Sequence, residues 1–154
     1  MPQVKSVKDA DVSGKRVLVR VDFNVPLEMH SGHAEVLADF RIRAVLPTIN
    51  FLIERGAAKI IILTHLGRPE GKVVENLRVA PVAARLHELI NTPRVEVLEN
   101  LRFDRREEAN DEYFAKELAA LGDIYVNEAF PVSHRADASL IGIPKFLPGY
   151  AGLR

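Results

Sequence analysis

Short apolar runs alternate along the chain with segments in which apolar residues recur at helical spacing. Four runs rich in apolar and β-branched residues predict buried strands over residues 16–21, 58–63, 95–98 and 123–126. Three segments with the helical spacing predict helices over residues 40–55, 79–90 and 111–121. Residues 27–38 are polar and irregular and predict a surface loop or hairpin. Residues 127–154 carry Gly and Pro throughout, and their apolar residues show no long helical or strand periodicity.

Proline and glycine adjust the predicted helix boundaries. Pro47 lies inside the first helical segment and predicts a kink or a late helix start there. Pro81 suits the first turn of the second helix. Gly56 and Gly122 stand where the first and third helices are expected to end.

Strands that alternate with helices predict βαβ units. The expected fold is therefore α/β: a parallel sheet with helices on both faces, in a Rossmann-like three-layer α/β/α arrangement. The 154 residues fit one compact domain. Ligands of such sheets bind beyond the carboxyl ends of the strands, so the segments after each strand are the first place to look for function.

Composition narrows the classes of partner. Lys+Arg and Asp+Glu both count 21, which argues against a general nucleic-acid or membrane-surface binder. The chain has no cysteine, so it has no disulfide frame, thiolate nucleophile or cysteine-based zinc site. The amino-terminal segment lacks the apolar region of a signal peptide. We expect a cytoplasmic protein that binds neither membranes nor nucleic acid.

Polar and basic side chains stand at the end of every predicted strand or in the segment that follows it. In chain order they are Arg20, Asp22, Asn24 and Arg41, then His65 and Arg68, then Arg102, then Asn127, His134 and Arg135. Arginine donates two parallel hydrogen bonds to a phosphate or carboxylate and keeps its charge. Clustered arginines repel one another, so such a cluster is costly without an anion. The pattern indicates a pocket for a small phosphorylated carboxylate, in which Asp22 accepts from a substrate hydroxyl and His65 adds a donor.

Each of these residues also has an ordinary structural interpretation. A single loop arginine is usually a solvated charge or a salt-bridge partner. Arg105 and Arg106 beside Glu107 and Glu108 are interpreted in this way, as surface ion pairs. His65 alone could be a satisfied core histidine, and His30, His33 and His87 are interpreted as surface residues. Four loops that agree at one end of one sheet favour the pocket.

Nucleotide and metal motifs are missing from the sequence. Neither G-x-x-x-x-G-K-[ST] nor G-x-G-x-x-G occurs, and no carboxylate cluster has metal-ligand spacing. We therefore expect no cofactor-binding and no metal-binding residues in this chain.

At the predicted strand ends the sequence resembles the phosphoglycerate kinase family. The matching motifs stand in family order: RVDFNVPL, the Arg41-Ile42 helix start followed by LPTI, THLGRP, ENLRF, and YVNEAF with SHRADAS. The resemblance extends from about Val12 to Leu153. It implies that residues 1–154 are the amino-terminal, substrate-binding domain of a two-domain glycolytic kinase. The carboxyl-terminal domain of that kinase, which these residues do not include, would bind Mg-ADP or Mg-ATP.

The resemblance also implies a role for each site residue. Asp22 and Asn24 would hold the hydroxyl and carboxylate end of 3-phosphoglycerate or 1,3-bisphosphoglycerate. The 3-phosphate would be bound by His65, Arg68, Arg102 and Arg135. Arg41 would be the catalytic residue, contacting the carboxyl group and the phosphoryl group in transfer. Arg20 would belong to the surrounding basic patch.

Some positions depart from the family pattern. Glu128 stands where the family commonly has Asp, Pro131 and Val132 where it often has Gly-Thr, and Asp137 where a second His is usual. Arg135 is retained, so phosphate binding is expected to persist while the loop changes its shape and charge.

Two other classes of function remain open on the sequence. One is a stand-alone anion-binding or regulatory α/β domain, of which a receiver-type signalling domain would need an acidic cluster at the strand ends. The other is a structural interaction domain. On the kinase interpretation we expect a monomer that does not catalyse transfer alone. Its apolar segment 140–153 is expected to allow weak self-association.

Overall fold

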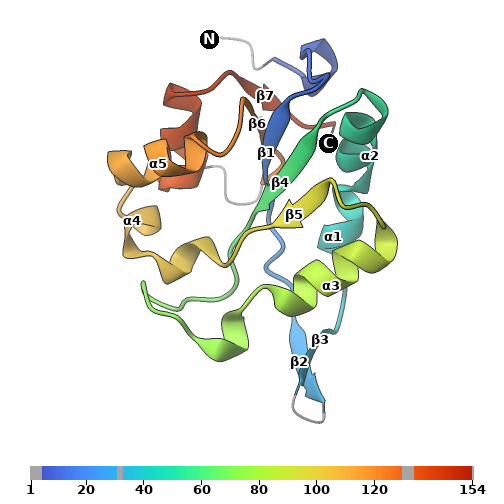
Figure 1. The fold of residues 1–154 in the computed structure, drawn as a ribbon. Helices are drawn as coiled ribbons and strands as arrows, with labels where there is room; N and C mark the ends of the chain where they lie inside the picture. Colours follow the sequence, from blue (N-terminus) through green and yellow to red (C-terminus); the bar gives the residue numbers. More distant parts are fainter. Residues whose placement is uncertain (1–4, 31–32, 130–133, 154) are drawn as a thin grey trace.

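The computed structural model describes residues 5–30, 33–129 and 134–153. Its centre is a parallel sheet in the order β5-β4-β1-β6-β7 (Figure 1). The strands are β1 (Arg16–Arg20), β4 (Lys59–Leu63), β5 (Val95–Val97), β6 (Ile124–Asn127) and β7 (Gly149–Ala151). A separate antiparallel hairpin, β2 (Leu27–His30) and β3 (His33–Val36), extends from the body of the protein. The four predicted strands are confirmed to within about one residue at each end.

Helices cover both faces of the sheet. One face carries α1 (Phe40–Ala44), α2 (Leu46–Glu54) and α3 (Ala80–Leu89), and the other carries α4 (Arg105–Glu108) and α5 (Glu112–Ala119). A π-helical segment (Ala138–Gly142) and a 3-10 turn (Ile143–Lys145) pack beside α5. Further 3-10 turns span Val7–Asp9, Glu75–Leu77 and Leu101–Phe103. No helix in the described ranges is long and apolar enough to cross a bilayer.

The side chains of β1 divide the core into two clusters. Val17 and Val19 are buried with the α2 residues Ile49 and Leu52 on one face. Leu18 is buried on the opposite face, in the cluster that includes residues of α5. This alternation is what a strand between two layers of helices requires. The expected α/β/α fold with a parallel sheet is therefore confirmed.

Pro47 has the effect that the sequence predicts. The segment 40–55 forms two helices that meet at Val45, and Pro47 is the second residue of the later helix. Proline lacks an N–H and is tolerated in a first helical turn. The break places Arg41 on a short helix of its own, close to the end of β1.

Within the segment 127–154, the described residues 134–153 form more regular structure than the sequence predicts. β7 pairs in parallel with β6, the Ala151 N–H donates to the Lys5 carbonyl at 2.7 Å, and the Gly152 N–H donates to the Asn127 carbonyl at 3.1 Å. Tyr150 and Leu153 pack against the larger core cluster. The strand is missed because it is only three residues long and lacks a hydrophobic alternation.

We expect Gly152→Ala to destabilise the fold and Gly149→Ala to be tolerated. A Cβ at Gly152 would lie 1.7 Å from Oε1 and 2.2 Å from Cδ of Glu128, whose side chain is fully buried. A Cβ at Gly149 would lie 3.8 Å from its nearest neighbour, an ordinary contact. Overpacking at Gly152 should lower the free energy of unfolding by roughly 1–3 kcal/mol in urea titrations. Equal stabilities of the two variants would contradict this packing argument.

Candidate functional site

The carboxyl ends of three neighbouring strands meet at one edge of the sheet. In the register of the sheet, Arg20 of β1 lies beside Leu63 of β4 and beside Asn127 of β6. The ends of these strands and of the neighbouring β5, together with the segments that follow them, carry the residues predicted from the sequence. We call Arg20, Arg41, Arg102 and Arg135, which surround His65, the arginine cluster.

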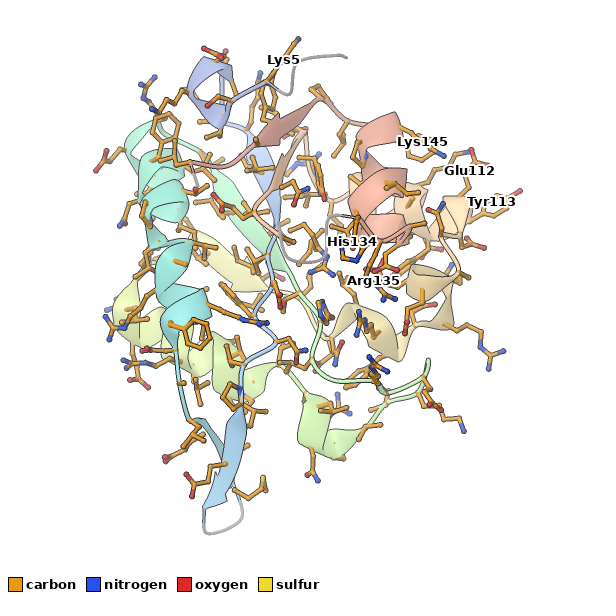
Figure 2. The ribbon with its side chains drawn as sticks, turned by 180° about the vertical axis from the view of Figure 1, so that it is seen from behind. Lys5, Glu112, Tyr113, His134, Arg135 and Lys145 are labelled. Carbon is orange, nitrogen blue, oxygen red and sulfur yellow. The ribbon has the colours of Figure 1, made fainter. Side chains whose placement is uncertain are left out.

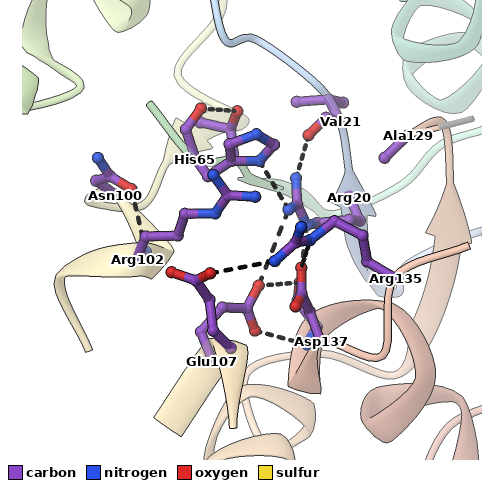
Figure 3. A network of polar contacts seen from close by, with 12 residues as sticks. Arg20, Val21, His65, Asn100, Arg102, Glu107, Ala129, Arg135 and Asp137 are labelled. Atoms are coloured by element: carbon purple, nitrogen blue, oxygen red, sulfur yellow. Dashed lines mark hydrogen bonds and ion pairs between the residues drawn. The ribbon is translucent and has the colours of Figure 1, made fainter. Parts of the chain in front are cut away.

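Arg20 lies at the buried centre of this cluster (Figure 3). Its Nε donates to Ser139 Oγ at 2.8 Å, Nη1 donates to the Val21 carbonyl, and Nη2 lies 2.9 Å from His65 Nδ1. Nη2 is also 3.9 Å from a carboxylate oxygen of Glu107. Burial lowers the pKa of Arg20, while the nearby carboxylates favour its charge. The fully buried Arg20 is therefore a structural centre rather than part of an open basic patch.

The prediction that Glu107 belongs to a surface ion pair is wrong. Its side chain is fully buried, faces Arg20 and accepts from the Ser139 N–H at 2.8 Å and from the Ser139 hydroxyl. Burial raises the pKa of this carboxyl, opposed by Arg20 and by the Ser139 hydrogen bonds. The prediction fails because α4 turns one residue of a uniformly charged run inward. The exposed Glu108 and Arg105 keep the surface position expected of them.

His65 is 2% exposed and lies among four arginines. A guanidinium only donates hydrogen bonds, so His65 Nδ1 accepts from Arg20. Burial, followed by the positive charges of Arg20, Arg102, Arg135 and Arg41, lowers the pKa of His65 to about 2. The imidazole is therefore neutral throughout the physiological pH range.

Only 7% of the surface of Arg102 is exposed, so this residue is as buried as many residues of the core. Its Nη1 donates to the Gly67 carbonyl at 2.9 Å, and its buried Nε has no hydrogen-bond partner among the described residues. Asn100 fixes the backbone at Arg102: Oδ1 accepts from the Arg102 N–H, and Nδ2 donates to the Leu66 and Leu77 carbonyls. Sequence reasoning missed Asn100, although an Asn at the start of a short helical turn is a recognisable capping signal.

Asp22, Asn24 and Arg41 form a second group beside His65. Arg41 Nη1 donates to Asp22 Oδ2 at 3.0 Å and to the Asn24 carbonyl at 3.1 Å. Asn24 Oδ1 accepts from the Gly67 N–H at 3.0 Å, which ties the loop after β1 to the loop after β4. In this conformation Asp22 is engaged by Arg41 rather than open toward a hydroxyl group.

Arg135 is held by two carboxylates at the outer side of the cluster. Its Nε donates to Asp137 Oδ2 and its Nη2 donates to Glu108 Oε2, both at 3.1 Å. The hydrogen bond and charge of Asp137 raise the pKa of Arg135. Figure 2 shows Arg135 and the exposed His134 at the start of the segment that leads into the π-helix.

The remaining predicted residues stand outside these contacts. Arg68 is exposed and makes no hydrogen bond or ion pair to the described residues. Asn127 accepts from the Ala129 N–H at 2.8 Å and serves the turn after β6. Pro131 and Val132 lie outside the described residues.

Two surface hollows lie away from the arginine cluster. One, of about 630 Å³, is lined by residues 34–39 and by α3, and the other, of about 420 Å³, lies between Val73, Phe103 and α5. Neither contains a member of the cluster. The polar network, rather than a hollow, therefore marks the candidate site.

A parallel sheet between two layers of helices, with arginines gathered around a histidine at the carboxyl ends of its strands, makes this chain an α/β/α domain whose polar network lies where such folds bind their ligands. The chain belongs to the phosphoglycerate kinase family, because the sequence profile described as phosphoglycerate kinase matches residues 7–97 and 91–154. The resemblance found in the sequence is thereby confirmed.

Relatives and solved structures agree with this assignment. The phosphoglycerate kinase of Roseiflexus sp. (strain RS-1) is 52% identical over 96% of this chain, and that of Synechococcus elongatus is 49% identical over 96%. The phosphoglycerate kinase structure from Coxiella burnetii superposes with a TM-score of 0.86 at 35% identity, covering 97% of this chain and 41% of that one. The structure from Pyrococcus horikoshii OT3 has a TM-score of 0.81 at 32% identity, covering 96% and 42%. The chain spans about 42% of the length of the Roseiflexus relative and 41% of the Synechococcus relative.

Burial of neutral His65 predicts a pH dependence of stability. The pKa of His65 falls from 6.5 to about 2 on folding. Below pH 6.5 the unfolded chain therefore binds a proton at this residue that the folded chain does not. The free energy of unfolding should fall as pH decreases from about 6.5, by up to about 1.4 kcal/mol per pH unit for this residue.

Urea titrations at about pH 7, 6 and 5 measure this slope. His65→Gln should make the slope shallower, while the matched variant His87→Gln, at an exposed position on α3, should leave it unchanged. The same slope in His65→Gln and in the parent protein would show that His65 is not its source.

Proposed function

We propose that this chain binds 3-phosphoglycerate or 1,3-bisphosphoglycerate as the substrate half of a phosphoglycerate kinase. The arginine cluster around His65 carries the proposal, because four guanidinium groups at one sheet edge suit a ligand with a phosphate and a carboxylate. Membership of the family supplies the substrate class. On this view the protein is a cytoplasmic, monomeric glycolytic component.

The proposal assigns the phosphate to the side of the cluster nearest the loops after β4, β5 and β6. There His65, Arg68, Arg102 and Arg135 would contribute donors to the 3-phosphate. One observation supports this assignment: the buried Nε of Arg102 has no hydrogen-bond partner among the described residues. A buried donor of this kind favours an anionic acceptor.

The carboxylate end of the substrate is assigned to Asp22, Asn24 and Arg41. Asp22 accepts from the substrate hydroxyl once Arg41 moves from Asp22 to the carboxyl group. In a complete kinase, Arg41 would then stabilise the charge that develops on the phosphoryl group at that carboxyl group. Its 37% exposed side chain allows such a rearrangement at low cost.

Nucleotide and Mg²⁺ are assigned to residues beyond these 154, as the family resemblance implies. The described residues hold no group of three or more His, Cys, Asp or Glu side chains suited to a metal ion. Binding of substrate without phosphoryl transfer is the activity proposed for it.

The isolated chain should bind 3-phosphoglycerate more tightly than glycerate in calorimetric titrations, and added salt should weaken binding. Arg102→Ala should cost about 1.5–3 kcal/mol of binding free energy through loss of a charge-assisted hydrogen bond. Arg94→Ala, an exposed arginine before β5, is the matched control and should bind as the parent does. Equal affinities for the two ligands would refute the phosphate assignment, and turnover in a coupled assay would refute the inactivity of the chain alone.

Asp137→Asn should strengthen binding of 3-phosphoglycerate. Asp137 competes with the ligand for Arg135 through a hydrogen bond of 3.1 Å. Because Arg135 is partly exposed, the gain should be modest, about two- to fivefold in Kd, as for a screened ion pair. Asp104→Asn, which removes a similar carboxylate from Arg106, is the control and should leave Kd unchanged. Unchanged or weaker binding by Asp137→Asn would exclude this competition.

A further inference from the structure

The contact between Arg20 and His65 determines which nitrogen of the imidazole carries the proton. Nη2 of Arg20 lies 2.9 Å from Nδ1 of His65. Since arginine has donors and no acceptor, Nδ1 must present its lone pair, and the proton of the neutral ring sits on Nε2. No hydrogen bond joins Nε2 to the described residues, which leaves that N–H available to a ligand.

Arg20 can impose this choice because it is itself held firmly. Its side chain is fully buried, and Ser139 and the Val21 carbonyl accept from its other donors. Three parts of the fold meet at this guanidinium: the end of β1, the loop after β4 and the π-helical segment. Rotation of Arg20 would break several buried hydrogen bonds at once.

Glu107 supplies the counter-charge that keeps Arg20 in place. Its carboxylate is fully buried, 3.9 Å from Arg20 Nη2, and is fixed by two hydrogen bonds from Ser139. A buried guanidinium without this partner would carry an uncompensated charge. Figure 3 shows Arg20 between His65 and the carboxylates of Glu107, on α4, and Asp137, which precedes the π-helical segment.

We propose that Arg20 and Glu107 are a positioning pair that fixes His65 as the Nε2–H tautomer, so that His65 offers one fixed neutral donor to the bound anion. The identity of that anion rests on the proposed function. The opposite tautomer would turn a lone pair toward a phosphate oxygen and repel it. A neutral ring also removes the proton uptake that would otherwise accompany binding near neutral pH.

Tautomers are measured directly by two-bond proton–nitrogen correlation spectra of the ¹⁵N-histidine-labelled chain without ligand. His65 should show a protonated Nε2 and an unprotonated, hydrogen-bonded Nδ1, unchanged between about pH 5 and 8. A protonated Nδ1, or a ring that titrates in this range, would overturn the proposal. This measurement decides the tautomer in the parent protein whatever the behaviour of any variant.

The double variant Arg20→Met with Glu107→Gln tests the role of the pair. It removes both charges together, and Gln can still accept from Ser139, so the fold is expected to survive. His65 should then exchange between tautomers, and 3-phosphoglycerate should bind roughly tenfold more weakly. The matched control Arg16→Met with Asp123→Asn removes an exposed ion pair at the opposite end of β1 and should change neither property. An unchanged tautomer in the folded double variant would disprove positioning.

A mutant cycle that combines the double variant with His65→Gln, measured as binding of 3-phosphoglycerate, separates positioning of His65 from a general structural effect. If the pair acts through His65, adding His65→Gln to the double variant should weaken binding little further. Fully additive losses would show that Arg20 and Glu107 act independently of His65 and would overturn the proposal. If the parent shows the expected tautomer but binds no 3-phosphoglycerate, the proposed function fails while the fixing of His65 by Arg20 stands.

Discussion

The mutual repulsion of arginines at one edge of the sheet is the constraint on which the rest of the site depends. Two unit charges 4 Å apart repel by about 4 kcal/mol at an effective dielectric of 20, so several guanidinium groups cannot gather there uncompensated. Carboxylates from three places meet this demand: Asp22 after β1, Glu107 and Glu108 on α4, and Asp137 before the π-helical segment. The short helix α4, all four of whose residues are charged, is thus held beside the sheet by charge rather than by apolar packing of its own.

The compensating pairs divide into a fixed inner set and an exchangeable outer set. Arg20 and Glu107 are both fully buried, and removing either partner alone would strand a charge in the interior. Arg41 and Arg135 are each 37% exposed, so water screens their ion pairs and little free energy is lost when an anion replaces a carboxylate. The inner pair therefore maintains the geometry while the outer arginines remain able to change partners.

Sequence reasoning succeeded where a local pattern carries the information and failed where a distant partner does. Apolar runs located β1, β4, β5 and β6, and the residues that follow them include Arg41, His65 and Arg102. From its sequence, the charged run of α4 is typical of a solvated surface. The prediction failed for Glu107 because its burial depends on Arg20 and Ser139, which are far away in the sequence. β7 was missed since its place in the sheet comes from β6 and from Lys5 rather than from its own three residues.

Two departures from the family pattern have physical counterparts elsewhere in this chain. Glu128, longer by one methylene than the usual Asp, reaches the Thr48 hydroxyl inside the protein and fills the space beside Gly152, where no side chain would fit. Asp137, in place of a second histidine, is buried and gives Arg135 an internal anion. The Glu128 departure is accommodated by local packing. The Asp137 departure changes the charge beside Arg135, a residue proposed to bind the phosphate. A similar fold can therefore carry a different balance between arginines and carboxylates. On the proposed function, that balance, rather than the set of arginines alone, governs how strongly the substrate anion is held.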